Sequence, residues 1–471
     1  MVLIIIILYF GLLFGISLLT GKGGNDAFFR AGRRSPWPLV AFGMIGTSIS
    51  GVTFVSVPGM VETADMTYLQ MCMGFFIGYL VIAFVLMPLY YRYGLTSIYT
   101  YLGTRLGPVS HKTGAWFFLL SKLTGAAARM YLVCLVLEQF LHVPFAVIAI
   151  SALLLIWLYT RRGGVRTLVW TDAMQTLCLI VALVLILMEV ATQLDFSFGE
   201  AIGAVWNDSH SRIFEFDDWT SKQHFWKQFL SGVFVAIVMT GLDQDMMQKN
   251  LTCKSLRDGQ KDLCSYGIMF LPVNFLFLSL GVLLLMLYAQ HPEMTVPEKG
   301  DTLLPTVIGS GLLGQTALAL FVIGIVASAF SSADSALTAL TTSFCIDIKG
   351  SSQGVTFRKR THAAMAVVFL LVMLGINAIG SSSVLDLIYT VAGYTYGPLL
   401  GLFVFGMTCR RPVRDRWVPF VAVASPLLCW LIDLTAQHLW NYTFGYELLM
   451  LNGLLTFVGL LCLSRNRQCP L

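Results

Sequence analysis

Residues 326–344, VASAFSSADSALTALTTSF, decide how the rest of this sequence is interpreted. The segment follows the apolar run LALFVIGI and precedes CIDI, which is the setting of a membrane-spanning helix. Yet it holds five serines, three threonines and the carboxylate of Asp334. A carboxylate at the centre of a membrane helix costs about 2.5–3.5 kcal/mol even on insertion scales. Asp334 therefore needs a cation, a proton or a basic partner.

The hydroxyl groups of this segment fall on one face of a helix. Spacings of three, four and seven residues relate Ser328, Ser331, Ser332, Ser335, Thr338 and Thr342. At 1.5 Å per residue from the inner end, residues 331–335 lie about 17–23 Å deep, near the bilayer midplane. Such hydroxyls either join membrane helices by hydrogen bonds or bind a hard alkali cation. The first interpretation leaves Asp334 unexplained, so the residue chemistry favours cation binding.

Composition predicts an all-α polytopic protein embedded in a lipid bilayer. Hydrophobic residues make up 57% of the 471 residues and charged residues only 12%, against roughly 25% charged in soluble proteins. Thirteen apolar runs are long enough to cross a membrane. They lie near 2–20, 38–61, 69–91, 113–140, 143–160, 167–192, 225–246, 263–290, 314–346, 361–380, 384–408, 417–437 and 447–464.

The basic residues predict the orientation of these spans. Most of the 30 lysines and arginines fall in alternate connecting segments, for example 161–166, 249–261 and 358–360. Because basic residues gather on cytoplasmic loops, we expect the N-terminus outside and the C-terminus inside the plasma (inner) membrane. The net charge of +5 is then a topology signal, and no nucleic-acid partner is expected.

Two sets of five spans, with opposite orientations, form the expected core. The first span of each set is interrupted: GMIGTSISGVTFVSVPG (43–59) is rich in glycine and polar residues, and Thr240-Gly241 interrupts the span at 225–246. Many transporters break these two helices near the midplane, although small residues also serve ordinary helix packing. The expected parts are 1–37 (peripheral helix and inner loop), 38–192 (first repeat), 193–224 (outer loop), 225–409 (second repeat) and 410–471 (two peripheral helices).

Three motifs carry a resemblance to a known family. They are T-D-x-x-Q at Thr171–Gln175, D-Q-x-x-x-Q at Asp243–Gln248, and the serine pair Ser331-Ser332. In this order, on this topology, the whole chain resembles the sodium:solute symporter family. The resemblance implies a LeuT-like 5+5 inverted-repeat fold and Na⁺ as the coupling ion.

The resemblance also implies ion ligands. The sodium site would use backbone carbonyls of Gly46, Ile49 and Ser328 and the hydroxyls of Ser331 and Ser332. Some relatives build a second site, which maps onto Asp172, Ser331, Asp334 and Ser335. Asp334 stands there in place of a hydroxyl-type ligand, so this second site would bind sodium more strongly or carry a proton.

The expected solute contacts differ from those of sugar carriers. Thr53, Ala236 and Met239 stand where those carriers place polar groups, and an apolar helix leaves buried sugar hydroxyls unpaired. Gln70, Tyr394 and Tyr396 are further candidates for the pocket or an outer gate. Ser48 stands where the sodium/proline branch has an acid.

Lys122 and Arg129 lie seven residues apart, on one face of the span at 113–140. Lys122 can extend to the inner surface, but Arg129 is too deep and needs a partner inside the protein. That partner is either an internal acid, Asp334 or Asp172, or the carboxylate of a substrate held by the planar guanidinium.

The sequence thus predicts sodium-coupled import of a small organic solute by alternating access. A carboxylate-bearing solute, an amino acid or a monocarboxylate, is favoured, and a monomer suffices for transport, with oligomers permitted. The alternatives are a neutral solute (sugar or nucleobase-like), a membrane sensor or an uncoupled channel. An enzyme is not expected, because the seven histidines lie in loops or near span ends without H-E-x-x-H or G-x-S-x-G patterns.

Overall fold

The computed structural model of this chain is helical throughout the ranges it describes, 2–21, 24–219, 221–291, 300–350, 354–379, 384–440, 442 and 444–464. In these ranges the extended pairings are two isolated bridges, Ser35 with Cys253 and Val413 with Ser464. The predicted all-α membrane fold is confirmed.

In the part of the chain that the structure describes, helix length and composition identify fewer membrane spans than the thirteen expected. Among the described residues, nine helices are long and apolar enough to cross a membrane, or eleven if each of two bent pairs is one span. Two shorter apolar helices, Ile6–Thr20 and Leu448–Leu463, lie where the first and last spans were expected. Thirteen therefore stays a prediction.

The helices follow one another along the chain with short connections. They are α1 (Val2–Thr20), α2 (Gly24–Arg30), η1 (Ala31–Arg33), α3 (Trp37–Ser48), α4 (Gly51–Ala64), α5 (Tyr68–Val81), η2 (Ile82–Leu86), α6 (Met87–Arg92), α7 (Thr100–Arg105), α8 (Pro108–Leu141), α9 (Phe145–Gly163), α10 (Val165–Gln193), α11 (Phe198–Asn207), η3 (Ser209–Ser211), α12 (Phe225–Ala236), η4 (Ile237–Gly241), α13 (Gln244–Asn250), α14 (Leu256–Gln290), η5 (Gly300–Thr302), α15 (Leu303–Gly309), α16 (Gly314–Ser343), η6 (Phe344–Ile348), α17 (Val355–Ile379), α18 (Val384–Thr408), η7 (Asp415–Trp417), α19 (Val418–Trp440) and α20 (Leu448–Leu463).

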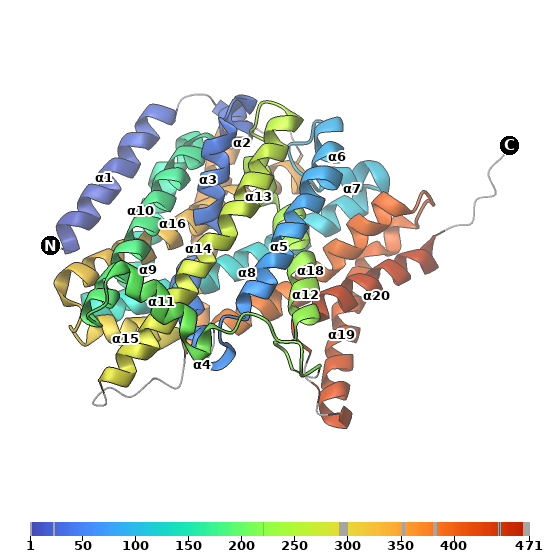
Figure 1. Cartoon of the computed structure of the whole chain (residues 1–471). Helices are drawn as coiled ribbons and strands as arrows, with labels where there is room; N and C mark the ends of the chain where they lie inside the picture. The colour runs from blue at the N-terminus through green and yellow to red at the C-terminus, as the bar shows by residue number, and fades with distance from the viewer. Residues whose placement is uncertain are drawn as a thin grey trace.

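The two predicted spans are broken, the first within the predicted segment and the second at Leu242-Asp243, directly after the predicted Thr240-Gly241. The axes of α3 and α4 differ by 63° across Ile49-Ser50, and those of the α12–η4 helix and α13 differ by 70° across Leu242-Asp243. Each broken pair precedes four long helices, α5–α6, α8, α9 and α10 in the first half and α14, α16, α17 and α18 in the second. In Figure 1, α1 lies at one edge of this core and α19 and α20 at the opposite edge.

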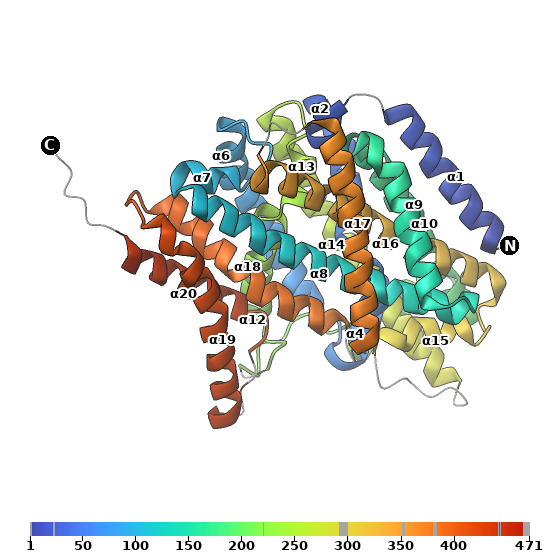
Figure 2. The same ribbon diagram turned by 180° about the vertical axis from the view of Figure 1, so that it is seen from behind.

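The hydroxyl-bearing helix α16 lies inside the molecule. Its most apolar stretch is 78% buried by protein, against 17% for α17 and 22% for the span that contains α19. It contacts α3, α8 and α10, whereas α17 and α19 lie on the periphery (Figure 2). The six hydroxyls of the stripe belong to residues that are at most 6% exposed. They therefore face other helices and not lipid.

Gly46 lets α3 approach α10 closely. Its backbone N–H donates to Thr176 Oγ1 at 3.1 Å. A Cβ added at Gly46 would lie 2.2 Å from the same Oγ1, which is far inside van der Waals contact. Only glycine fits at this contact without a shift of α3, and α3 carries the first break.

We predict that Gly46→Ala lowers the thermal-unfolding midpoint of the purified protein. Overpacking of this kind costs about 1–3 kcal/mol. Thr176→Ala in the same chain should restore part of the loss, because it removes the nearest atom. Gly125→Ala is the matched control, since nothing lies within 4 Å of its new Cβ. Equal midpoints for Gly46→Ala and Gly125→Ala would contradict this packing.

Candidate cation and solute site

The first break releases two backbone carbonyls from the helical pattern. In a continuous helix the Ser50 N–H would bond the Gly46 carbonyl, but it donates to Ser48 O at 3.1 Å. The first backbone bond of α4 runs from Phe54 N to Ser50 O. The carbonyls of Gly46 and Ile49 thus take no part in the regular helical bonds across the break, as a cation site there requires.

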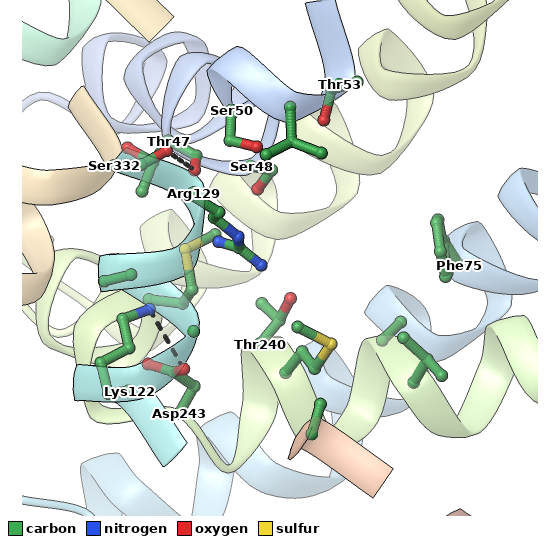
Figure 3. A pocket seen from close by; sticks show the side chains of 18 of the residues that line it. Thr47, Ser48, Ser50, Thr53, Phe75, Lys122, Arg129, Thr240, Asp243 and Ser332 are labelled. Atoms are coloured by element: carbon green, nitrogen blue, oxygen red, sulfur yellow. Dashed lines mark hydrogen bonds and ion pairs between the residues drawn. The ribbon is translucent and has the colours of Figure 1, made fainter. Parts of the chain in front are cut away.

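The serine pair of α16 lies against this break. Ser332 Oγ donates to the Thr47 carbonyl at 3.0 Å, and Ser331 Oγ lies 3.2 Å from Thr47 Oγ1. Figure 3 shows Ser332 beside Thr47, next to Ser48 and Ser50. The hydroxyl of Ser328 instead donates to Ile325 O in its own helix at 3.0 Å. The structure thus brings the elements with all five expected ligands together.

The residues of the expected second site also lie together. Asp172 on α10 accepts hydrogen bonds from Ser331 Oγ at 3.0 Å and Ser335 Oγ at 3.4 Å. Asp334 accepts from Tyr159 OH at 2.5 Å and from Ser335 Oγ at 3.2 Å. These side chains are buried.

This cluster contains a cation that the sequence interpretation placed elsewhere. Lys249 was counted with the inner loops, but it lies on α13 and is 2% exposed. Its Nζ is 2.6 Å from Asp172 Oδ2 and 2.6 Å from Thr47 Oγ1. The 70° bend before α13 directs this half-helix toward α3 and α16, which it contacts.

A cavity adjoins the break on the side of α8 and α12. It encloses about 1110 Å³, part of it open to solvent. Its polar lining includes Ser48, Ser50, Thr53, Ser121, Arg129 and Thr240, and its apolar lining includes Phe75, Val235, Ala236, Met239 and Phe270. Thr53, Ala236 and Met239 thus lie in the cavity where solute contacts were expected, with Ser332 at its edge.

Arg129 extends its guanidinium into this cavity (Figure 3). Among the described residues it forms no ion pair: Asp172 is paired with Lys249, and Asp334 is bonded by Tyr159 and Ser335. The expectation of an internal salt bridge from Arg129 to either acid is not met.

Lys122 behaves differently from the prediction. Instead of extending to the inner surface, its Nζ lies 3.2 Å from Asp243 Oδ2 and 2.6 Å from Asp245 Oδ2. Tyr396 OH donates to the same Asp243 oxygen at 2.5 Å. Lys122, Asp243 and Tyr396 line the cavity beside the second break, since Asp243 directly precedes α13.

Two other candidates lie outside this cavity. Gln70 is buried, and its Nε2 donates to Gln223 O at 2.9 Å while its Oε1 accepts from Glu215 N at 3.1 Å, so its amide holds the segment between α11 and α12. Tyr394 lines a second, adjoining cavity with Lys222, Asp433 and Glu447. Tyr396 lines both cavities.

The two glutamines of the D-Q-x-x-x-Q motif position α13, a role that the sequence did not predict. Gln244 Oε1 accepts from Ile98 N at 2.9 Å, and Nε2 donates to Thr96 O at 2.9 Å. Gln248 Nε2 donates to Thr342 Oγ1 at 3.0 Å. The two amides hold α13 against the 96–98 turn and α16. The available signal was the density of polar groups in DQDMMQK after an apolar span.

Comparison with known proteins agrees with this arrangement. The family model described as "Sodium:solute symporter family" matches residues 28–415. The chain belongs to the sodium:solute symporter family. It is accordingly a sodium-coupled symporter of a small-molecule solute in a membrane, and not an enzyme, as the motifs predicted.

Individual relatives cover nearly the whole chain. The sodium/sialic acid symporter NanT of Aliivibrio fischeri is 25% identical over 94% of this chain and 89% of its own length. The sodium-coupled monocarboxylate transporter 1 of Mus musculus is 22% identical over 82% of this chain and 65% of its own. A solved Na⁺-coupled sialic acid symporter has a TM-score of 0.82 at 21% identity, over 99% of both chains. Mhp1, a nucleobase-cation-symport-1 transporter, has a TM-score of 0.58 at 14% identity, over 93% and 94%.

We predict that Ser331→Ala and Ser332→Ala each raise the sodium concentration for half-maximal uptake by about tenfold. A contact between a hydroxyl and a charged group contributes about 1.5–3 kcal/mol, and 1.4 kcal/mol corresponds to a factor of ten. Initial uptake rates measured against sodium concentration check this.

Ser328→Ala is the matched control for these two variants. Its hydroxyl bonds its own helix, and only its carbonyl is an expected ligand, so its sodium dependence should stay that of the wild type. If Ser331→Ala and Ser332→Ala also behave like the wild type, the ligand assignment is wrong.

Proposed function

We propose that this symporter imports a small organic anion whose carboxylate binds Arg129, driven by sodium bound at the first helix break. The observation that carries this proposal is the guanidinium of Arg129, which extends into the cavity without an acid partner among the described residues.

The charges of the core support an anionic solute. Lys122 and Lys249 form ion pairs with aspartates, whereas Arg129, which lines the cavity, forms no ion pair among the described residues. An unpaired cation within a membrane protein is costly. Arg129 therefore favours an incoming anion, and its planar fork fits a carboxylate in two parallel hydrogen bonds.

The lining of the cavity supports an amphipathic solute. Thr53, Ser50 and Ser121 lie on the side of the first break and α8, whereas Ala236, Met239 and Phe270 form an apolar side. Such a site fixes one polar end of a ligand and covers the rest by apolar contact.

The relatives narrow the substrate only to a class. Three relatives of similar identity are named for sialic acid, iodide and monocarboxylate, which are anions, and another is named for multivitamins. We therefore propose sugar acids and small organic acids, amino acids included, as the solutes to test first. A neutral sugar or nucleobase would leave Arg129 unpaired, whereas each of these acids carries a carboxylate for it.

Coupling follows from the position of the ion. Sodium at the carbonyls of Gly46 and Ile49 and the hydroxyls of Ser331 and Ser332 would fix the angle between α3 and α4, and Thr53 on α4 lines the solute cavity. An ion that binds one arrangement better shifts the population toward it and raises solute affinity. Asp334 and Ser335 stay proposed as part of a second cation position with Asp172, which holds a sodium ion, a proton or the ammonium group of Lys249.

The domain boundaries and orientation remain part of this proposal. We infer that 38–192 and 225–409 are the two repeats, that 193–224 is an outer loop, and that the N-terminus lies outside. The break at the same place in each half supports the repeats.

We predict that Arg129→Gln abolishes binding of the carboxylate solute while sodium still raises the thermal-unfolding midpoint. The lost contact is a charge-assisted pair of about 1.5–3 kcal/mol or more. A midpoint screen of the purified protein, with and without sodium, against sugar acids, monocarboxylates, amino acids and neutral sugars measures both properties.

Arg129→Lys is the matched control, because it keeps the charge but loses the planar fork. Its affinity should fall between those of the wild type and Arg129→Gln. Loss of folding in Arg129→Gln would indicate a structural role for this arginine. If Arg129→Gln folds and still binds a neutral solute as the wild type does, the neutral-solute alternative is favoured.

A further inference from the structure

The cluster beside the predicted sodium site already contains a cation. Lys249 Nζ lies 2.6 Å from Asp172 Oδ2 and 2.6 Å from Thr47 Oγ1. The hydroxyls of Ser331 and Ser335 donate to the same carboxylate at 3.0 Å and 3.4 Å. A lysine ammonium has one positive charge and three donors, and it occupies the Asp172 oxygen and the Thr47 hydroxyl that a monovalent metal ion at this position would need.

We propose that Lys249 permanently fills the second cation position, so that this protein binds one sodium ion and not two. The inference rests on the proposed sodium site at the first break, and it sets the number of ions that accompany the solute. In this proposal Lys249 determines how many sodium ions the protein binds.

Charge balance supports this assignment. A sodium ion at the second position would share the Asp172 carboxylate with the ammonium, and two like charges a few ångströms apart in a water-poor interior repel strongly. The remaining acid, Asp334, accepts bonds from the neutral donors of Tyr159 and Ser335. The carboxylate of Asp172 is therefore compensated without a metal ion.

The fold holds Lys249 in this place. It lies in the last turn of α13, after the second break, and Gln248 beside it bonds Thr342 of α16. Lysine 249 reaches Thr47, two residues before the first break. The ammonium group of Lys249, on the second broken helix, thus lies against the first broken helix, and the lysine is buried there.

The test is equilibrium binding of radioactive sodium to the purified protein, which does not depend on transport. We expect one ion per wild-type protein. Lys249→Met should bind two, because the apolar side chain leaves Asp172 without a cation and frees the oxygens of Asp172 and Thr47 that the ammonium contacts. Sodium should also raise the unfolding midpoint of Lys249→Met more than that of the wild type.

Two control variants isolate the charge. Lys249→Arg keeps a cation and should bind one ion, and the double variant Lys249→Met with Asp172→Asn removes both charges and should also bind one. Two ions on the wild type, or one on folded Lys249→Met, would overturn the inference and leave sodium coupling intact. If Lys249→Met does not fold, the number of sodium ions bound by the wild-type protein tests the inference without the variant. A wild type that binds no sodium would overturn the proposed sodium site itself.

Discussion

Contact between the hydroxyl face of α16 and the broken helix α3–α4 is the interaction on which the rest of this structure depends. A row of oxygens near the middle of a bilayer is stable only where protein surrounds it, and α16 is the span with the largest buried share among those measured. Across from it, the break releases backbone carbonyls that a regular helix would have used. The serine pair of α16 bonds Thr47 of α3, and the oxygens at the break come from two different helices.

The charged side chains of the core form two ion-paired clusters with an arginine between them. Asp243 and Asp245 hold Lys122 at the second break, and Asp172 holds Lys249 at the first. Arg129 extends into the cavity between these clusters. Buried ion pairs contribute little net stability once desolvation is included, but losing one partner is costly. This arrangement suits a protein that must hold two conformations of similar free energy and accept a charged solute in one of them.

The sequence predicted the elements that depend on local pattern. Apolar length predicted the helices, glycine and polar residues predicted both breaks, and i, i+3, i+4 spacing predicted the buried face of α16. It did not predict which side chains meet across elements. Lys249 reaches Thr47 only because the axis turns by 70° before α13, and Gln70 bonds Glu215, more than 140 residues away. Such contacts depend on angles between helices, which a single sequence does not encode at the level of composition or periodicity.

The most direct measurement of the central claim is an experimental structure determined in sodium at a resolution that shows ions. The account predicts density between the carbonyls of Gly46, Ile49 and Ser328 and the hydroxyls of Ser331 and Ser332. The Ser332 hydroxyl would then have turned from the Thr47 carbonyl toward the ion. An ion found elsewhere, with Ser332 still bonded to Thr47 in a protein whose uptake requires sodium, would contradict it.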